Sequence, residues 1–254
     1  MLQPDVALET TSRCEMMGGM TSTNPPGSVA SAQDQWPRWG IPTAIGSLLG
    51  FVVLSFAVSA AAVVLGTDQV TAGIIGTLAG WLSLAGVPIV VSWWRGNGPR
   101  SDFALRFRPA DLGIGLLAGV IMLVVGMIFV LVYLQVTGRA PTSSLGIAAE
   151  GARADWQLLA LAALALGAPF VEELHFRGMW WTALRRRGLG GWPTLLVTAI
   201  LFALLHLEPA RSALLFAAGL AAGYVRMITD RLGPAIVTHF LINLLGVIGL
   251  LSML

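Results

Sequence analysis

Seven apolar segments dominate the sequence, and most are long enough to cross a lipid bilayer, which takes about 20 residues of helix. Hydrocarbon contains no water to bond backbone amides and carbonyls, so spanning segments of this kind form helices with internal hydrogen bonds. We therefore predict an all-α, polytopic membrane helix bundle with about seven transmembrane helices, the fifth and sixth being short. The segments cover residues 41–66, 70–94, 112–136, 158–184, 192–207, 212–229 and 234–254.

Composition agrees with this class and excludes others. Hydrophobic residues make up 56% of the chain and charged residues 11%, whereas a typical soluble domain has roughly 25% charged residues. The chain therefore has too few charges for a soluble enzyme or a disordered protein. All 15 basic residues are arginine, and they flank apolar segments instead of forming one basic face, so we expect no nucleic-acid partner. The one cysteine, Cys14, excludes an internal disulfide.

The segments divide the chain into three parts. Residues 1–39 are polar and rich in Ser, Thr, Pro and Gly, and we predict a disordered cytoplasmic tail without a cleavable signal peptide. Residues 40–157 contain the first three transmembrane helices and their connecting loops. Residues 158–254 contain the last four helices, which form the third part.

Arginine placement predicts the orientation of the chain in a cell membrane, either an inner or a plasma membrane. Eleven arginines lie on the N-terminal side of the bilayer, three lie on the opposite side, and Arg177 lies within a span. This asymmetry predicts a cytoplasmic N-terminus and an external C-terminus. The eleven are Arg13, Arg38, Arg95, Arg100, Arg106, Arg108, Arg185, Arg186, Arg187, Arg226 and Arg231.

Small residues and prolines predict details of the helices. Pro88 and Pro169 lie inside spans and are expected to kink them. Residues 115–119 and 219–223 carry glycines four apart, a pattern suited to close helix packing but common by chance in a chain with 30 glycines.

Ionisable and amide side chains inside spans are concentrated in the last four helices. Such groups cost roughly 2.5–3.5 kcal/mol each for the charged types on insertion scales and are functional candidates by default. We therefore expect the chemistry here. The residues are Glu172, Glu173, His175, Arg177, His206, His239 and Asn243, which include all three histidines of the protein.

Helical geometry predicts which of these groups meet. Glu173 and Arg177 are four residues apart and can form an ion pair on one helix face. A rise of about 1.5 Å per residue places Glu172 and His206 at similar depth, roughly 20 Å from the cytoplasmic side. The same calculation places His239 and Asn243 only about 8–14 Å from the cytoplasmic side. Helix tilt is therefore needed to bring them to the depth of Glu172 and His206.

Three motifs in this region resemble those of a known family. Residues 172–178 (Glu-Glu-Leu-His-Phe-Arg-Gly) resemble the EExxxR motif of the CPBP intramembrane proteases, the group of the CAAX prenyl endopeptidases and their bacteriocin-processing relatives. Residues 202–206 resemble its FxxxH motif, and residues 239–243 resemble its HxxxN motif. The ordered set is specific, and it covers about residues 158–250.

The resemblance implies an intramembrane endopeptidase, with the four helices of residues 158–254 as its catalytic core. Carried over by motif position, Glu172 and His206 would activate a water, while His239 and Asn243 would stabilise the oxyanion that forms. Glu173, Arg177 and Phe202 would support them, and Glu173 also stays open as the base. A carboxylate beside an imidazole can take a proton from water, which agrees with these roles.

Cofactor and substrate stay open at this point. Glu172, His206 and His239 match the ligand types of a catalytic zinc site. The helical His-Glu-x-x-His signature of zinc proteases is absent, however. A zinc-dependent site and a metal-independent site therefore both stay open. The expected substrate is a membrane-associated peptide or protein, either prenylated or bacteriocin-like.

Structural roles and other functions compete with this interpretation. Glu173 and Arg177 can be a purely structural ion pair, and His175 is expected to be structural. Trp180 and Trp181 are expected to be interfacial anchors. A non-catalytic immunity or scaffold protein on the same fold is the main alternative function. A proton-coupled transporter is disfavoured because the sequence has no repeated halves.

Overall fold

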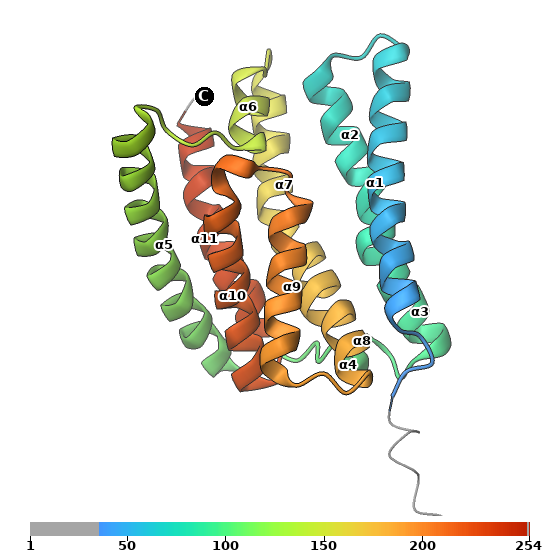
Figure 1. Cartoon of the computed structure of the whole chain (residues 1–254). Helices are drawn as coiled ribbons and strands as arrows, with labels where there is room; N and C mark the ends of the chain where they lie inside the picture. Colours follow the sequence, from blue (N-terminus) through green and yellow to red (C-terminus); the bar gives the residue numbers. More distant parts are fainter. Residues whose placement is uncertain (1–35, 253) are drawn as a thin grey trace, which may run out of the picture.

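The computed structural model describes residues 36–252 and 254, and every regular element in this part of the chain is a helix (Figure 1). The predicted all-α fold is thus confirmed. Residues 1–35 of the predicted tail, with Cys14 and Arg13, lie outside the described residues. The elements are α1 (Ile41–Val64), α2 (Gln69–Trp81), the π-helix η2 (Leu82–Gly86), α3 (Val87–Arg95), α4 (Pro99–Asp102), α5 (Pro109–Thr137), α6 (Ser144–Glu150), α7 (Asp155–Glu173), the π-helix η3 (Leu174–Trp180), α8 (Trp181–Arg186), α9 (Gly191–Leu205), the 3-10 turn η4 (Pro209–Arg211), α10 (Ser212–Thr229) and α11 (Gly233–Leu251).

Six helical stretches in the described chain are long and apolar enough to cross a membrane, and α9 is a shorter apolar helix of 15 residues. This agrees with the predicted bundle, in which the fifth segment is short. Two of the stretches are composite: Gln69–Arg95 joins α2, η2 and α3, and Asp155–Arg186 joins α7, η3 and α8. In both, the chain stays helical through a π segment.

Helices α7, α9, α10 and α11 pack around one another, with α5 against α11 on one side and α1 to α3 on the other side of α7 (Figure 1). The chain crosses this bundle in alternating directions. The start of α1 and the C-terminus consequently lie at opposite ends of the molecule (Figure 1).

Both glycine patterns lie at helix crossings. A Cβ on Gly115 would meet the Val237 side chain at 2.5 Å, and one on Gly119 would meet Leu241 at 2.8 Å, so α5 approaches α11 closely. On α10, a Cβ on Gly219 would lie 3.0–3.2 Å from Ala199 of α9. The close helix packing that these patterns favour is therefore confirmed.

The end of the bundle where α1 begins is held by buried polar contacts. Trp39, which falls in the predicted tail, is buried, and its indole nitrogen donates to the Asp102 carboxylate at 3.2 Å. Arg186 donates to the Trp39 carbonyl. Arg231 donates to both oxygens of the buried Asp111 carboxylate, with a shortest distance of 2.5 Å. Some of the arginines that predict topology thus also join elements.

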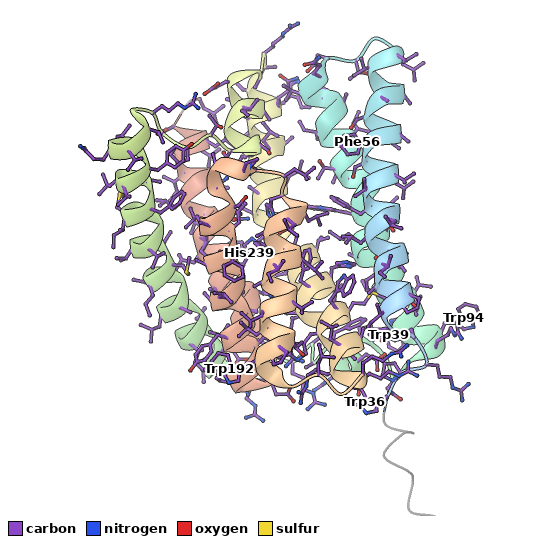
Figure 2. All side chains as sticks on the ribbon, in the orientation of Figure 1. Trp36, Trp39, Phe56, Trp94, Trp192 and His239 are labelled. Atoms are coloured by element: carbon purple, nitrogen blue, oxygen red, sulfur yellow. The ribbon has the colours of Figure 1, made fainter. Side chains whose placement is uncertain are left out.

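Exposed tryptophans mark the same end, where Figure 2 labels Trp36, Trp94 and Trp192. Trp94 is 79% exposed, as an interfacial anchor would be. The same expectation was wrong for Trp180 and Trp181, which are 7% and 5% exposed. They face the protein, where Trp180 donates to His175 of the same π-helix and Trp181 contacts Arg226 of α10.

Candidate active site

Glu172 lies near the end of α7 and faces two histidines from other helices. Its Oε2 atom is 3.8 Å from His206 Nε2 and 3.9 Å from His239 Nε2. This oxygen is buried and has no hydrogen-bond partner in the described part of the chain, although the Glu172 side chain as a whole is 18% exposed. The gaps exceed a direct hydrogen bond, and a water between these atoms could bond to both sides.

His206 is held at the C-terminal end of α9 with a defined tautomer. Its Nδ1 lies 2.7 Å from the Phe202 carbonyl oxygen one turn earlier. A carbonyl can only accept, so Nδ1 carries the hydrogen, and Nε2 presents a lone pair toward Glu172 when the ring is neutral. The next residue, Leu207, has φ +52° and ends the helix. Helix geometry thus aims the imidazole at the carboxylate.

His239 of α11 is anchored by the second glutamate. Its Nδ1 lies 3.0 Å from Glu173 Oε1, and both side chains are buried. With Nδ1–H donated to this carboxylate, the Nε2 atom is turned toward Glu172. Figure 2 labels His239 near the middle of the bundle, where its Nε2 lies 3.9 Å from Glu172 Oε2 of α7. Helix packing therefore closes the expected depth mismatch for this residue.

Glu173 and Arg177 form the predicted ion pair. Arg177 Nη1 lies 2.9 Å from Glu173 Oε1, and both side chains are fully buried. Arg177 Nη2 donates to the Gly219 carbonyl of α10 at 2.6 Å. One oxygen of Glu173 therefore receives both Arg177 and His239, and Glu172 is the carboxylate that faces the Nε2 atoms of both His206 and His239.

Phe202 is the packing centre of the cluster. It is 2% exposed, and its ring centroid lies 4.5 Å from that of His206 and 5.4 Å from that of His239. The Arg177 guanidinium lies 4.9 Å from the same ring, a distance suited to a cation–π contact. Phe202 therefore packs against both imidazoles and against the Arg177 guanidinium.

Asn243 and His175 are not brought into this group. The Asn243 amide nitrogen donates to the Ala165 carbonyl at 2.9 Å, one turn along α11 from His239. The His175 ring is fully buried on another side of its helix, where the Trp180 indole nitrogen donates to its Nε2 at 3.0 Å. Ser47 contacts its other ring nitrogen at 3.5 Å. These contacts agree with a structural role for His175 and explain why Trp180 faces inward.

The residues considered for zinc come together in pairs. Within residues 36–252 and 254, no group of three or more His, Cys, Asp or Glu side chains is arranged to hold a metal ion. Glu172 lies between His206 and His239, but its Oε2 is 3.8–3.9 Å from each. The donor types suit zinc while this geometry does not provide a ligand group, so we assign no chemical step to a metal.

Two contributors to the cluster were missed by sequence reasoning. The Gly219 carbonyl has no side-chain signal, and only the glycine spacing marks its position. Arg226 was counted as a topology signal, yet it is 4% exposed and donates through Nε to the Arg177 carbonyl at 3.2 Å. Arg226 lies inside the predicted span 212–229, one turn before its end, and this position could have indicated a buried role.

Comparison with known proteins supports a family for the region that contains this cluster. Residues 154–245 match the family model described as Rce1-like, type II CAAX prenyl endopeptidase. The resemblance of the three motifs to the CPBP and CAAX proteases is thereby confirmed for this C-terminal region. At the level of the family, the match implies a membrane-embedded endopeptidase that acts on proteins or peptides. No curated protein and no solved structure matches the chain.

Proposed function

We propose that this protein hydrolyses a peptide bond of a membrane-associated or lipidated peptide, with residues 158–254 as the catalytic core. The observation that carries the proposal is the buried, unpartnered Glu172 Oε2 between the Nε2 atoms of His206 and His239. Three separate helices supply these groups, and the cost of placing them within a membrane argues for a function.

In the proposed reaction, Glu172 and His206 activate a water. The water oxygen attacks the scissile carbonyl carbon while its proton passes to Glu172. The C–N bond then breaks, and the proton moves from Glu172 to the leaving amine, so the carboxylate is regenerated. A base placed at hydrogen-bond reach typically contributes about 10²–10⁴-fold to rate.

His239 and Asn243 are proposed to stabilise the oxyanion. Because Nδ1 of His239 faces Glu173, its Nε2 can donate only when the ring is protonated, and the Glu173 carboxylate would balance that charge. The Asn243 amide has a second N–H besides the one given to Ala165. Loss of one such donor typically costs about 10²–10³-fold in kcat.

Helix α9 offers a source of water. Its 15 residues rise only about 22 Å, which is shorter than the roughly 30 Å hydrocarbon core. His206 at its end therefore lies where the backbone leaves the helix below the far surface. Irregular backbone at membrane depth is tolerated where it lines a water-filled cavity, and such a cavity would hydrate the site.

The test is cleavage by the purified protein, followed by mass spectrometry. The substrates are a prenylated peptide ending in a CAAX sequence, its unprenylated form, and a bacteriocin-like precursor. The variants Glu172→Ala, His206→Ala and His239→Ala should each abolish turnover, with His175→Gln as the control that retains it. A fully active Glu172→Ala would falsify the mechanism. Parallel assays with a zinc chelator test the metal question separately.

A further inference from the structure

We propose that Arg226 is a positioning residue, which holds the π-helical segment η3 so that Arg177 and Glu173 orient His239. This inference rests on the proposed function for its kinetic readout only. The first observation is the hydrogen bonding of η3. In an α-helix the Trp181 amide would bond to the Arg177 carbonyl, whereas here it bonds to the carbonyls of Phe176 and Gly178. The Arg177 carbonyl receives Arg226 Nε at 3.2 Å.

Arg226 is well held for this task. Its guanidinium donates through Nη1 to Asp230 at 2.7 Å and lies 5.4 Å from the Trp181 ring centroid. The side chain is 4% exposed, whereas the Asp230 carboxylate is 91% exposed. A residue that serves only as a topology signal would extend into the interface. The Arg226 side chain instead points into the protein and contacts Arg177, the residue of η3 that carries a buried charge.

Helix α10 contacts Arg177 at two places. Gly219 accepts from the Arg177 side chain at 2.6 Å, and Arg226 donates to the Arg177 backbone at 3.2 Å. These two contacts hold both the backbone and the side chain of Arg177, and they orient its guanidinium toward Glu173 at 2.9 Å. Glu173 in turn meets His239 Nδ1 at 3.0 Å. Arg226 thus acts on His239 through a continuous series of contacts.

The chain supplies matched variants to test this. Arg226→Lys keeps the positive charge but cannot reproduce the two separate N–H donors of the planar guanidinium. Asp230→Asn removes the charge partner and leaves the contact with the Arg177 carbonyl in place. Positioning through η3 predicts that only Arg226→Lys alters the site, whereas a simple charge anchor predicts the reverse, because lysine keeps the charge and Asp230→Asn removes its partner.

The first measurement does not depend on activity. Only three histidines are present, so the ¹⁵N spectrum of histidine-labelled protein in nanodiscs can be assigned by single substitutions. Arg226→Lys should shift the His239 ring resonances, whereas Asp230→Asn should leave them at their wild-type positions. If His239 is unmoved in a folded Arg226→Lys protein, the proposal is overturned, whether or not the protein proves to be a peptidase.

The second measurement is kinetic. Arg226→Lys should lower kcat by about tenfold or more, with KM unchanged within about twofold, because the defect lies in the catalytic groups and not in substrate binding. It should also shift the pH profile of kcat, which Asp230→Asn should leave in place. A wild-type protein that cleaves nothing would count against the proposed function while the spectrum still decides the role of Arg226.

A truncation keeps the test decisive if Arg226→Lys fails to fold. A cavity of about 280 Å³ adjoins Arg226, with Trp181 and Asp230 in its lining, so Arg226→Ala would leave space that an external guanidinium ion can enter. Millimolar guanidinium should restore the wild-type His239 resonances in Arg226→Ala. It should restore nothing in Arg177→Ala, whose side chain is fully buried and does not line this cavity. Absence of rescue in folded Arg226→Ala contradicts the proposal.

Discussion

At the scale of single residues, two neighbouring glutamates have opposite surroundings. Glu173 is fully buried and bonded to Arg177 and His239 through one oxygen. Both residues have a buried Oε2 without a hydrogen-bond partner, but Glu172 has no bonded oxygen to offset it and faces His206 and His239 at 3.8 and 3.9 Å. A carboxylate without a bonded partner in the folded state adds little to stability, and retaining it suggests a chemical role.

This difference predicts opposite phenotypes for two conservative substitutions. Glu172→Gln should abolish turnover but leave the thermal midpoint Tm unchanged or higher, since it removes a charge with no bonded partner. Glu173→Gln should lower stability by about 3 kcal/mol, because it strips the buried Arg177 of its counter-charge. Thermal unfolding of the purified proteins beside the cleavage assay measures both. Equal losses of Tm would contradict the assignment of roles.

At the scale of elements, close packing of α10 on α9 delivers a backbone carbonyl to Arg177. Gly219 permits that approach because it has no side chain, and its own carbonyl accepts the guanidinium. The glycine spacing in residues 219–223 thus serves the site as well as the packing. The π segment η3 has a matching effect, because it keeps the helix continuous past Glu173 while changing where Arg177 points.

Gly219→Ala should therefore damage the site from a distance. The new Cβ would lie 3.0–3.2 Å from Ala199, against backbone atoms that cannot rotate away. We expect α10 to move from α9, with a loss of about 1–3 kcal/mol for an overpacked contact and a marked fall in turnover. Gly246→Ala is the control, since a Cβ there meets nothing within 4 Å. That variant should be as stable as the wild type or more so.

The N-terminus of α2 carries a pH-dependent contact. The Thr71 hydroxyl donates to Asp68, as do the Thr71 and Val70 amides, and these bonds hold the pKa of Asp68 below its ordinary value of 3.8. Gln157 of α7 also donates to this carboxylate at 2.9 Å. A lowered folded-state pKa stabilises the protein at pH above about 4, and this stabilisation disappears as the pH falls through the folded-state value.

We therefore expect Asp68→Ala to lower Tm at neutral pH, and we expect the gap from the wild type to narrow in acid. Thermal unfolding across a pH series from neutral to about pH 3 measures this. Asp155→Ala serves as the comparison carboxylate at a helix N-terminus. A Tm difference between the wild type and Asp68→Ala that stays constant over the whole pH range would show that the ionised Asp68 carboxylate does not contribute to stability.

At the scale of the whole molecule, the short helix α9 decides the number of crossings. Its length alone would leave six spans, which would put both chain ends on one side of the membrane. The described chain nonetheless begins and finishes at opposite ends of the bundle, with α9 running along it beside α10 (Figure 1). Seven crossings therefore stay a prediction, from which the arginine asymmetry predicts a cytoplasmic N-terminus and an external C-terminus.

This topology predicts the behaviour of reporters fused after Leu254. In bacterial cells, alkaline phosphatase at this position should be active because it folds outside, and a green fluorescent protein should stay dark. The same reporters placed in the loop around Gly188, beside Arg185 to Arg187, should give the reverse pattern. Matching signals at the two positions would contradict seven crossings.

The sequence alone predicted a membrane protein, its all-α fold class and the candidate residues of the site. Long apolar segments dictate helices because lipid cannot bond the backbone, and buried ionisable groups are so costly that their positions stand out. It could not determine how those residues meet. The contact of His239 with Glu173, the free oxygen of Glu172 and the inward turn of Arg226 depend on tilt, π-helical turns and helix crossings. These are set by the packing of several helices at once, and linear spacing on one straight helix does not contain them.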